Sequence, residues 1–372
     1  MVRVAMLAVL LTACGGGKDD DSGAGATDGT ATGGPGTGGG GTATGGSGTA
    51  TGGGTATGGT ATGGTATGGT ATGGTTPRPP DPFTVGPYRY TATVEMVDLG
   101  DRGPDFPSEV PAVIALPTLM PAPVVVFSHG FLISVDDYDS TVAHLATHGF
   151  VVIGPQYDEG VLTSRTHTGL AEDVVGLLDW IDATAATPGS ILDGRVDVDR
   201  IGALGHSRGG KQNFLASLLD DRIDALFAID PVDTSPLPNP ADYPSVTPER
   251  IGDVSVPVAY IGAGLGATGT VACAPEAENY RQYYDNGGSP AWVYMFPNAG
   301  HADFTDPCAA SPGPFNCRTC EFGDDPKAYR DLMRALSTAF FRVHLAGDAD
   351  FEPWMNNPQD FISSVDIEVD SK

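Results

Sequence analysis

The feature that most constrains this chain is the alternation of short apolar runs with amphipathic segments between about residues 83 and 345. Residues 124–127 form a β-branched apolar run, typical of a strand buried on both faces. Residues 172–181 carry apolar side chains at helical spacing. Because strands that alternate with helices form crossover units, we predict an α/β fold with a mostly parallel central sheet flanked by helices. Its chemistry should lie at the carboxyl ends of strands.

The predicted elements follow one another without a linker-like break. Only about 25 residues separate two of the predicted strands, at 223–229 and 256–261, so we expect no large cap domain. Strands are predicted at 88–97, 108–116, 124–127, 150–153, 200–204, 223–229, 256–261 and 291–296, the first two as a hairpin. Helices are predicted at 138–148, 172–181, 211–219, 276–284 and 327–345.

A low-complexity stretch precedes this pattern. Residues 15–80 are almost entirely Gly, Thr and Ala, and the pentad Thr-Ala-Thr-Gly-Gly recurs in them. Such a stretch has too few large apolar side chains to offset the entropy lost on ordering. We therefore expect a disordered tether at 15–80 and a single folded domain at 81–372.

The N-terminus has the composition of an export signal. Arg3 precedes an apolar run at residues 4–11, which is too short to span a bilayer. The run ends in Leu-Thr-Ala-Cys, which resembles the bacterial lipobox. The resemblance implies that residues 1–14 are a lipoprotein signal peptide with its lipidated residue, Cys14. We expect an exported protein anchored to the cell envelope, at the outer membrane or cell surface.

The net charge of −27 excludes some partners. Nucleic acid requires a basic surface, and so does docking on anionic lipid through side chains. We therefore expect no nucleic acid partner, membrane contact through the lipid anchor only, and a monomer.

Four further cysteines favour disulfides. Cys273, Cys308, Cys317 and Cys320 make an even number, and an exported chain meets an oxidising compartment. Their pairing is open, since three connectivities are possible. The Cys-x-x-Cys spacing at 317–320 could also suggest redox or zinc chemistry, but it lies in a Pro/Gly-rich loop. We predict two disulfides, one between Cys273 and this loop and one within it, and no metal.

The sequence Gly-His-Ser-Arg-Gly at residues 205–209 matches a nucleophile elbow. A predicted strand enters it and a predicted helix leaves it, which is the context that exposes a serine hydroxyl on a sharp turn. A serine in this place could instead only cap the helix. The context makes Ser207 the candidate nucleophile.

A serine nucleophile needs a base, and the base needs an orienting acid. His301 follows the strand predicted at 291–296, whereas His344 lies inside the last predicted helix, so His301 is the candidate base. The strand predicted at 223–229 ends at Asp230, and Asp233 follows three residues later. Asp230 is our choice for the acid, and Asp233 is the alternative acid. If it is not the acid, Asp233 would serve as a turn or helix-capping residue.

The oxyanion hole should use two backbone N–H groups. One belongs to Arg208, the residue after the nucleophile. The other should come from the loop after the strand at 124–127, and we assign it to Phe131. His129 lies in the same loop, and we interpret it as shaping the loop.

Together these motifs resemble the chlorophyllase and chlorophyllase-like hydrolases, from about residue 124 to 345. The matching segments are His-Gly-Phe at 129–131, Gly-His-Ser-Arg-Gly-Gly-Lys at 205–211, Ile-Asp-Pro-Val at 229–232, Gly-x-Gly-Leu-Gly at 262–266, Cys-Ala-Pro-Glu at 273–276 and Gly-His-x-Asp at 300–303. The resemblance implies an α/β-hydrolase fold and places the triad acid at Asp230.

The sequence thus predicts a cofactor-free carboxylic ester hydrolase that works through an acyl-enzyme, on an ester with an apolar or bulky group. The alternatives are a general esterase or lipase, a cutinase-like polyester hydrolase, a peptidase of the same fold, or a non-catalytic surface lipoprotein. An assay with ester and peptide substrates distinguishes these classes.

Overall fold

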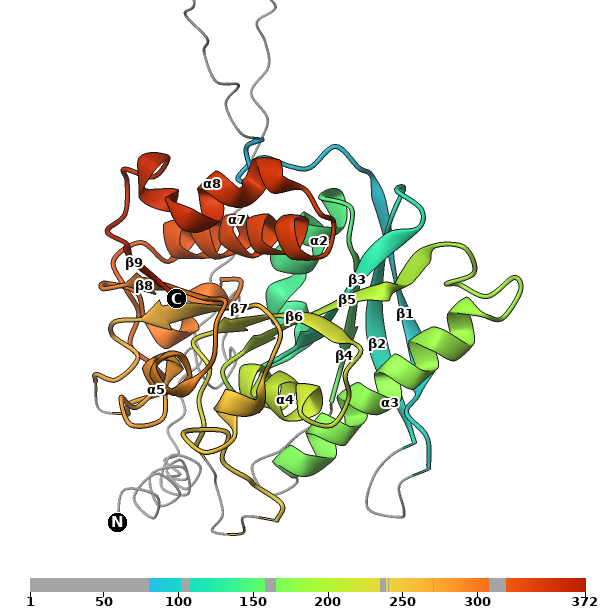
Figure 1. The fold of residues 1–372 in the computed structure, drawn as a ribbon, viewed down its shortest axis with the longest axis horizontal. Helices are drawn as coiled ribbons and strands as arrows, with labels where there is room; N and C mark the ends of the chain where they lie inside the picture. The colour runs from blue at the N-terminus through green and yellow to red at the C-terminus, as the bar shows by residue number, and fades with distance from the viewer. Residues whose placement is uncertain are drawn as a thin grey trace, which may run out of the picture. The chain divides into compact units, whose positions relative to one another are not determined.

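A single mixed sheet forms the centre of the structure, which is a computed structural model that describes residues 80–101, 108–157, 165–234, 239, 241–269, 271–307 and 319–372 (Figure 1). Within these residues the sheet has nine strands in the order β1-β2-β4-β3-β5-β6-β7-β8-β9. Their bounds are β1 Tyr90–Asp98, β2 Glu109–Pro117, β3 Ala122–Ser128, β4 Val151–Pro155, β5 Val196–His206, β6 Ile223–Ile229, β7 Val258–Ala263, β8 Ala291–Phe296 and β9 Glu368–Ser371.

The six strands from β3 to β8 are parallel, and the edges of the sheet are antiparallel. β1 pairs antiparallel with β2, β2 with β4, and β9 with β8. This arrangement confirms the predicted α/β-hydrolase-type fold with a mostly parallel sheet. It also brings the carboxyl ends of β3, β5, β6 and β8 to one edge of the sheet.

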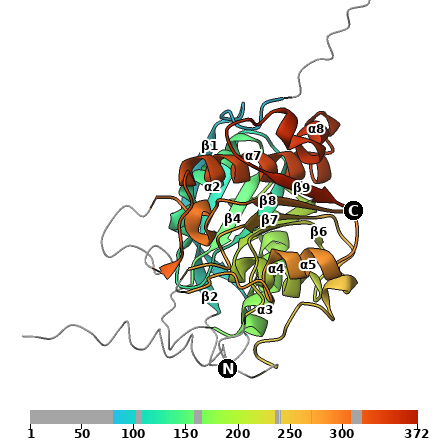
Figure 2. The same ribbon diagram turned by 90° about the vertical axis from the view of Figure 1, so that its left-hand side faces the viewer.

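Helices cover both faces of the sheet (Figures 1 and 2). Side chains of α3, α4 and α5 belong to one buried cluster, and those of α2, α7 and α8 belong to another. In β3, Val124 and Val126 join the first cluster while Val125 and Phe127 join the second, so the strand is buried on both faces as its composition predicts. The helices are α2 Asp139–Thr147, α3 His167–Ala185, α4 Arg208–Ser217, α5 Tyr280–Asn286, α7 Pro326–His344 and α8 Glu352–Asn356.

Short 3₁₀ helices complete the described elements: η1 Val135–Tyr138, η2 Ile251–Asp253, η3 His301–Phe304, η4 Ala349–Phe351 and η5 Pro358–Asp360. In the described part of the connection between β6 and β7, η2 is the one regular element. That observation agrees with the expected lack of a large cap domain there.

Several predicted elements differ from the observed ones at their ends. The helix predicted at 172–181 is longer in the structure, where α3 runs from His167 to Ala185. The helix expected at 276–284 begins only at Tyr280, because the Asn279 side chain accepts a hydrogen bond from the Arg281 N–H and caps the helix there. The strand expected at 200–204 is longer in the structure, where β5 starts at Val196 and ends at His206. The strand β9 was not predicted.

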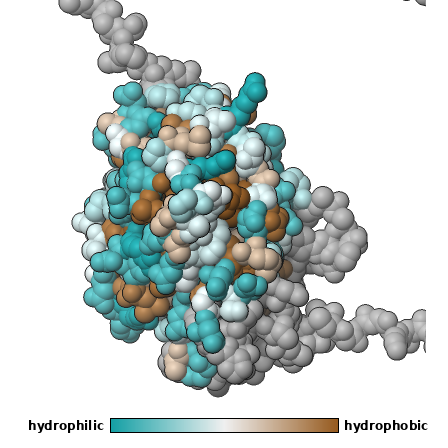
Figure 3. Space-filling model, turned by 90° about the vertical axis from the view of Figure 1, so that its right-hand side faces the viewer, coloured by the Kyte–Doolittle hydropathy of each residue, from teal (hydrophilic) through white to brown (hydrophobic). Residues whose placement is uncertain are grey.

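The surface in Figure 3 is largely hydrophilic, with separate apolar patches. Exposed large apolar side chains include Val94 and Met96 of the edge strand β1, at 64% and 56% exposure. Scattered apolar side chains of this kind are ordinary on a folded surface. No helix within the described ranges has the length and apolarity needed to cross a membrane.

Candidate active site

Ser207 lies on a sharp turn between β5 and α4. Its backbone adopts φ 56° and ψ −123°, outside the conformations that non-glycine residues usually adopt. The turn packs tightly against the end of β3. A Cβ on Gly209 would lie 2.0 Å from the Ser128 carbonyl oxygen, so only glycine fits there. The predicted motif requires a glycine at position 209 because the turn of Ser207 approaches the end of β3 so closely.

His301 and Asp230 meet through a short hydrogen bond. The distance between His301 Nδ1 and Asp230 Oδ2 is 2.7 Å, and both side chains are buried. The other carboxylate oxygen, Oδ1, accepts from the Ala263 N–H at 3.2 Å. Because the carboxylate accepts the Nδ1 proton, Nε2 is the nitrogen that remains for proton exchange with a nucleophile.

Asp233 has a different set of partners. Its Oδ1 lies 3.0 Å from Lys211 Nζ, and both side chains are almost fully buried. The carboxylate also accepts from the N–H groups of Val246 and Thr247 and from the Thr247 hydroxyl. The structure therefore brings Asp230, and not Asp233, to His301.

The turn that carries His301 is braced by Asp303. One oxygen of Asp303 accepts from the N–H of Gly300 at 2.7 Å and from the N–H of Gly323 at 2.8 Å. Burial raises the pKa of Asp303, and these two hydrogen bonds oppose that shift. No separate role for Asp303 is predicted from the sequence. Its position three residues after Gly300 matches the spacing by which an acidic side chain reaches back to a helix N-cap.

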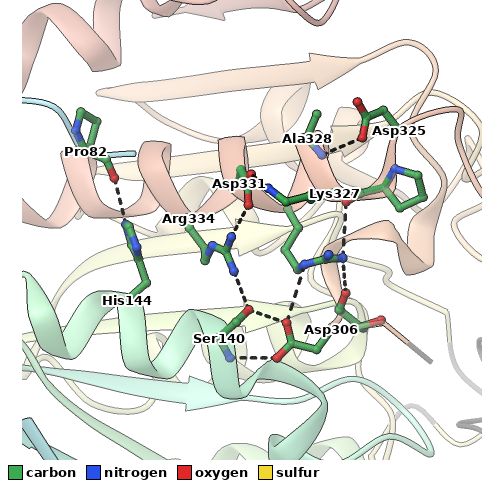
Figure 4. Close-up of polar contacts among 12 residues, drawn as sticks. Pro82, Ser140, His144, Asp306, Asp325, Lys327, Ala328, Asp331 and Arg334 are labelled. Atoms are coloured by element: carbon green, nitrogen blue, oxygen red, sulfur yellow. Dashed lines mark hydrogen bonds and ion pairs between the residues drawn. The ribbon is translucent and has the colours of Figure 1, made fainter. Parts of the chain in front are cut away.

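The chain after this turn is fixed to two helices (Figure 4). The Asp306 carboxylate accepts from the Ser140 N–H at 2.8 Å and from the Ser140 hydroxyl, at the start of α2. Arg330 of α7 donates to the Thr305 carbonyl oxygen at 2.9 Å, and Arg334 donates to the Ser140 hydroxyl at 2.6 Å. A carboxylate at a helix N-terminus is favoured by the helix dipole. The turn of His301 is therefore held on both of its sides.

Of the predicted disulfide cysteines, Cys273 and Cys320 form a bond with a Cα–Cα distance of 5.7 Å. This pairing links the connection after β7 to the segment that packs against Gly300. A Cβ on Gly300 would lie 1.9 Å from the carbonyl oxygen of Glu321. Cys308, Cys317 and the predicted lipidation site Cys14 lie outside the described residues.

Phe131 and Arg208, the two predicted oxyanion-hole residues, lie side by side. The Arg208 guanidinium lies 5.4 Å from the centre of the Phe131 ring, and its Nη2 lies 3.5 Å from the Gly130 carbonyl oxygen. Arg208 is the first residue of α4, and N–H groups in a first helical turn have no partner within the helix. His129 donates through Nδ1 to the Gly130 carbonyl oxygen at 2.9 Å, as expected of a residue that shapes this loop.

Strained backbone is concentrated at this edge of the sheet. Among the described residues, the non-glycine residues with positive φ are Leu132 at 56°, Ser207 at 56° and Asp230 at 40°. Each follows a parallel strand, and two of them are the candidate nucleophile and acid. Such conformations cost about 1–3 kcal/mol each and persist mainly at functional sites, where the surrounding structure holds them. Backbone strain thus marks the same place as the sequence motifs.

The described residues contain no group of three or more His, Cys, Asp or Glu side chains arranged to hold a metal ion. The described edge does hold a serine on a sharp turn and a histidine bonded to a carboxylate, which are the residue types that a serine nucleophile, an imidazole base and an orienting acid would require.

The chain is similar to several known proteins. The family model for chlorophyllase matches residues 81–369. Chlorophyllase-2 of Arabidopsis thaliana is 27% identical over 241 residues, which are 61% of this chain and 74% of that protein. Chlorophyllase type 0 of Chenopodium album is 27% identical over 251 residues, which are 61% of this chain and 68% of that protein. The chloroplastic chlorophyllase-1 of Citrus unshiu is 27% identical over 255 residues, which are 67% of this chain and 75% of that protein.

Proposed function

This chain belongs to the chlorophyllase family, and from that premise we propose that it hydrolyses carboxylic esters through Ser207, His301 and Asp230. The observation that carries the proposal is the 2.7 Å hydrogen bond between His301 Nδ1 and Asp230 Oδ2, at the same sheet edge as the strained serine. The sequence motifs and the backbone strain point to the same edge, and the family membership supports ester hydrolysis as the reaction.

The proposed reaction proceeds through an acyl-enzyme. Ser207 Oγ attacks the ester carbonyl carbon while its proton moves to His301 Nε2. The C–O bond then breaks, and the leaving alcohol takes that proton. Water attacks the acyl-enzyme with His301 again as base, which releases the carboxylic acid and restores the serine hydroxyl. Asp230 holds the ring and stabilises the imidazolium at each stage.

Charge on the carbonyl oxygen would be stabilised by two backbone N–H groups, those of Phe131 and Arg208. Support comes from the position of Arg208 at the first residue of α4 and from the contact of its side chain with the Phe131 ring. Removing a single donor from such a site in other enzymes costs about 10²–10³ in kcat.

We assign the substrate to esters with an apolar or bulky group. The absence of a regular cap domain in the described part of the β6–β7 connection supports an open mouth above Ser207. Chlorophyll is the first ester to test because of the family. Simple lipid esters and polyesters are the alternative substrates, and peptides would indicate a peptidase.

The test is a screen of the wild-type protein and Ser207→Ala on p-nitrophenyl esters of rising chain length, chlorophyll, a polyester and a peptide. We expect ester hydrolysis in the wild type and a loss of about 10⁴ or more in Ser207→Ala. Residual activity above roughly a thousandth of wild type would exclude Ser207 as nucleophile. A folded wild type that cleaves no ester would instead favour a non-catalytic surface lipoprotein.

We also propose that the enzyme is an exported lipoprotein, attached to the cell envelope through Cys14. The support is the Leu-Thr-Ala-Cys sequence and the Gly/Thr/Ala stretch that follows it. The stretch would place the catalytic domain at a distance from the membrane surface.

A further inference from the structure

His206 is adjacent to both the candidate nucleophile and the candidate base. It is the residue before Ser207, and its side chain is only 1% exposed. Its Nε2 is 2.9 Å from the carbonyl oxygen of His301, and its Nδ1 is 2.6 Å from the hydroxyl of Tyr138. The centres of the His206 and His301 rings are 4.6 Å apart. A side chain at the elbow is therefore bonded to the backbone of the residue that serves as base.

These contacts determine the tautomer of His206. A carbonyl oxygen can only accept, so Nε2 must carry the hydrogen that bonds His301. Burial lowers the pKa of His206 well below its ordinary value, and the nearby His301 lowers it further, so the ring is neutral. In a neutral ring the second nitrogen accepts, and Nδ1 therefore receives the Tyr138 O–H. The tyrosine hydroxyl selects the tautomer that can hold His301.

Tyr138 extends the connection to the oxyanion loop. The residue is fully buried at the end of η1, and its hydroxyl is hydrogen-bonded to the backbone of Gly130. Gly130 also packs on His206, since a Cβ there would lie 3.5 Å from His206 Nδ1. Gly130 immediately precedes Phe131. One set of bonds thus runs from this loop through Tyr138 and His206 to the His301 carbonyl.

We propose that His206 is a positioning residue for His301 and that Tyr138 fixes the tautomer of His206. Together the two side chains hold the loop that contains Phe131, the turn of Ser207 and the turn of His301 in fixed positions relative to one another. The inference rests on the proposed function, because it assigns His301 the role of base. A displacement of about 1 Å in such a constellation can cost about 10²-fold in rate.

A neutral His206 also suits the charge that develops beside it. During the proposed reaction the His301 ring becomes an imidazolium, and a second imidazolium with its centre 4.6 Å away would repel it. The other aromatic rings that pack against the His206 ring are those of Tyr138 and Phe304, neither of which carries charge at neutral pH. The network therefore holds His301 without adding a charge next to it.

Two amide substitutions separate the two bonds of His206. The amide of Gln reaches the place of Nε2, so His206→Gln can still donate to the His301 carbonyl oxygen. The amide of Asn reaches only the place of Nδ1, so His206→Asn keeps a partner for Tyr138 and loses the bond to His301. We expect His206→Asn to lose about 10²-fold in kcat with KM within about threefold of wild type. His206→Gln should recover at least about a tenth of wild-type kcat.

Tyr138→Phe tests the tautomer. Without the hydroxyl, only the His301 carbonyl oxygen still favours the hydrogen on Nε2. The tautomer with hydrogen on Nδ1, which places a lone pair of Nε2 against that oxygen, then becomes more populated. We expect kcat to fall by roughly tenfold while KM changes little. If His206→Asn does not fold, this variant decides the question, and an unchanged kcat would overturn the proposal.

His148→Asn is the matched control. His148 is also buried and bonds a backbone carbonyl through Nε2, that of Thr84 at 3.0 Å, but it lies at the end of α2 rather than at the site. We expect a lower unfolding midpoint and an unchanged kcat. If His206→Asn and His206→Gln both keep wild-type kcat while Ser207→Ala is inactive, only the positioning role is wrong. If Ser207→Ala keeps its activity, the proposed function itself is wrong.

Discussion

Asp230 and Asp233 lie in one short segment after β6, yet the structure gives them different partners. Asp230 is bonded to the imidazole of His301, and Asp233 is paired with Lys211 and two backbone N–H groups. Asp230 is completely buried and adopts a positive φ of 40°. Asp230 is therefore the candidate catalytic acid, and Asp233 has the contacts of a structural residue.

Substituting each aspartate should damage a different property. Asp230→Asn should lower kcat by about 10⁴ with little loss of stability, because the amide no longer holds the required tautomer of His301. Asp233→Asn should destabilise the fold by about 3–5 kcal/mol, since it breaks the buried ion pair between Asp233 and Lys211. Ester hydrolysis and urea unfolding of both variants provide the comparison, and the reverse order of damage in kcat would move the acid to Asp233.

At the scale of elements, the disulfide closes a loop that contains the base. Cys273 and Cys320 are 47 positions apart, and His301 lies between them. The bonded segment continues to Gly323, whose N–H donates to the Asp303 brace. The covalent link therefore joins the connection after β7 to the turn that presents His301.

Removing this disulfide should lower stability first and activity second. A loop of 47 positions predicts about 4 kcal/mol from the restricted unfolded chain. We expect Cys273→Ser/Cys320→Ser to unfold at a lower temperature, with a far-UV circular dichroism spectrum close to wild type and a reduced kcat. Since reduction would also break any bond made by Cys308 or Cys317, the double variant isolates the observed one. An unfolding midpoint equal to that of the wild type would refute the structural role.

The first segment of the described chain is fastened to α2 by two histidines. His144 donates through Nε2 to the Pro82 carbonyl oxygen at 2.9 Å (Figure 4). His148 bonds the Thr84 carbonyl oxygen in the same way. Burial lowers the pKa of His144 to about 4, and the neighbouring His148 contributes to the shift. The attachment is therefore built on a neutral imidazole.

This shift predicts a loss of stability in acid. The folded-state pKa of His144 is below its unfolded value of 6.5, so the native state binds fewer protons in the interval between them. Its contribution is complete above pH 6.5 and is lost as the pH falls toward 4, with roughly 2 kcal/mol gone by about pH 4.5. His144→Gln keeps a donor and removes the titration. Urea unfolding at pH 7 and pH 4.5 should show that the free energy of unfolding changes less with pH in this variant than in the wild type. An equal change in both proteins would contradict the assignment to His144.

At the scale of the whole molecule, charge and chain organisation act together. A net charge of −27 favours solubility and disfavours direct adsorption of the protein to anionic membranes. Attachment would then depend on the lipid at Cys14, and residues 15–80 would separate the anchor from the domain. Anchor and catalysis should be independent properties in this organisation.

We therefore expect Cys14→Ser to move the protein from the membrane fraction to the soluble fraction with its specific activity unchanged. Fractionation of the expressing cells followed by an ester assay on both fractions measures the two properties separately. A variant that remains with the membrane would rule out anchoring at Cys14. A variant that is released but inactive would show that the anchor also supports the fold.

The sequence by itself determined the architecture and the candidate position of the chemistry. The β6 and β8 strands coincide with the predicted ranges 223–229 and 291–296, because apolar runs of that length form buried strands wherever they occur in such a pattern. Strand-to-helix connections were also visible, which placed the elbow at Ser207. Buried strands and strand-to-helix turns depend mainly on residues that are close together in the sequence. Hydrophobic periodicity and turn residues are therefore enough to predict them.

Only the tertiary structure decided which distant groups meet. Asp230 and His301 are 71 positions apart, and Tyr138 and His206 are 68 apart. The polar strand β9 is defined by its antiparallel pairing with β8, and its own composition gives no strand signal. The partner of Cys273 likewise follows from which segment packs beside Gly300. Each of these pairings forms because the sheet and helices bring separate loops together in space. Local sequence patterns cannot predict such pairings, since the paired residues are far apart in the chain.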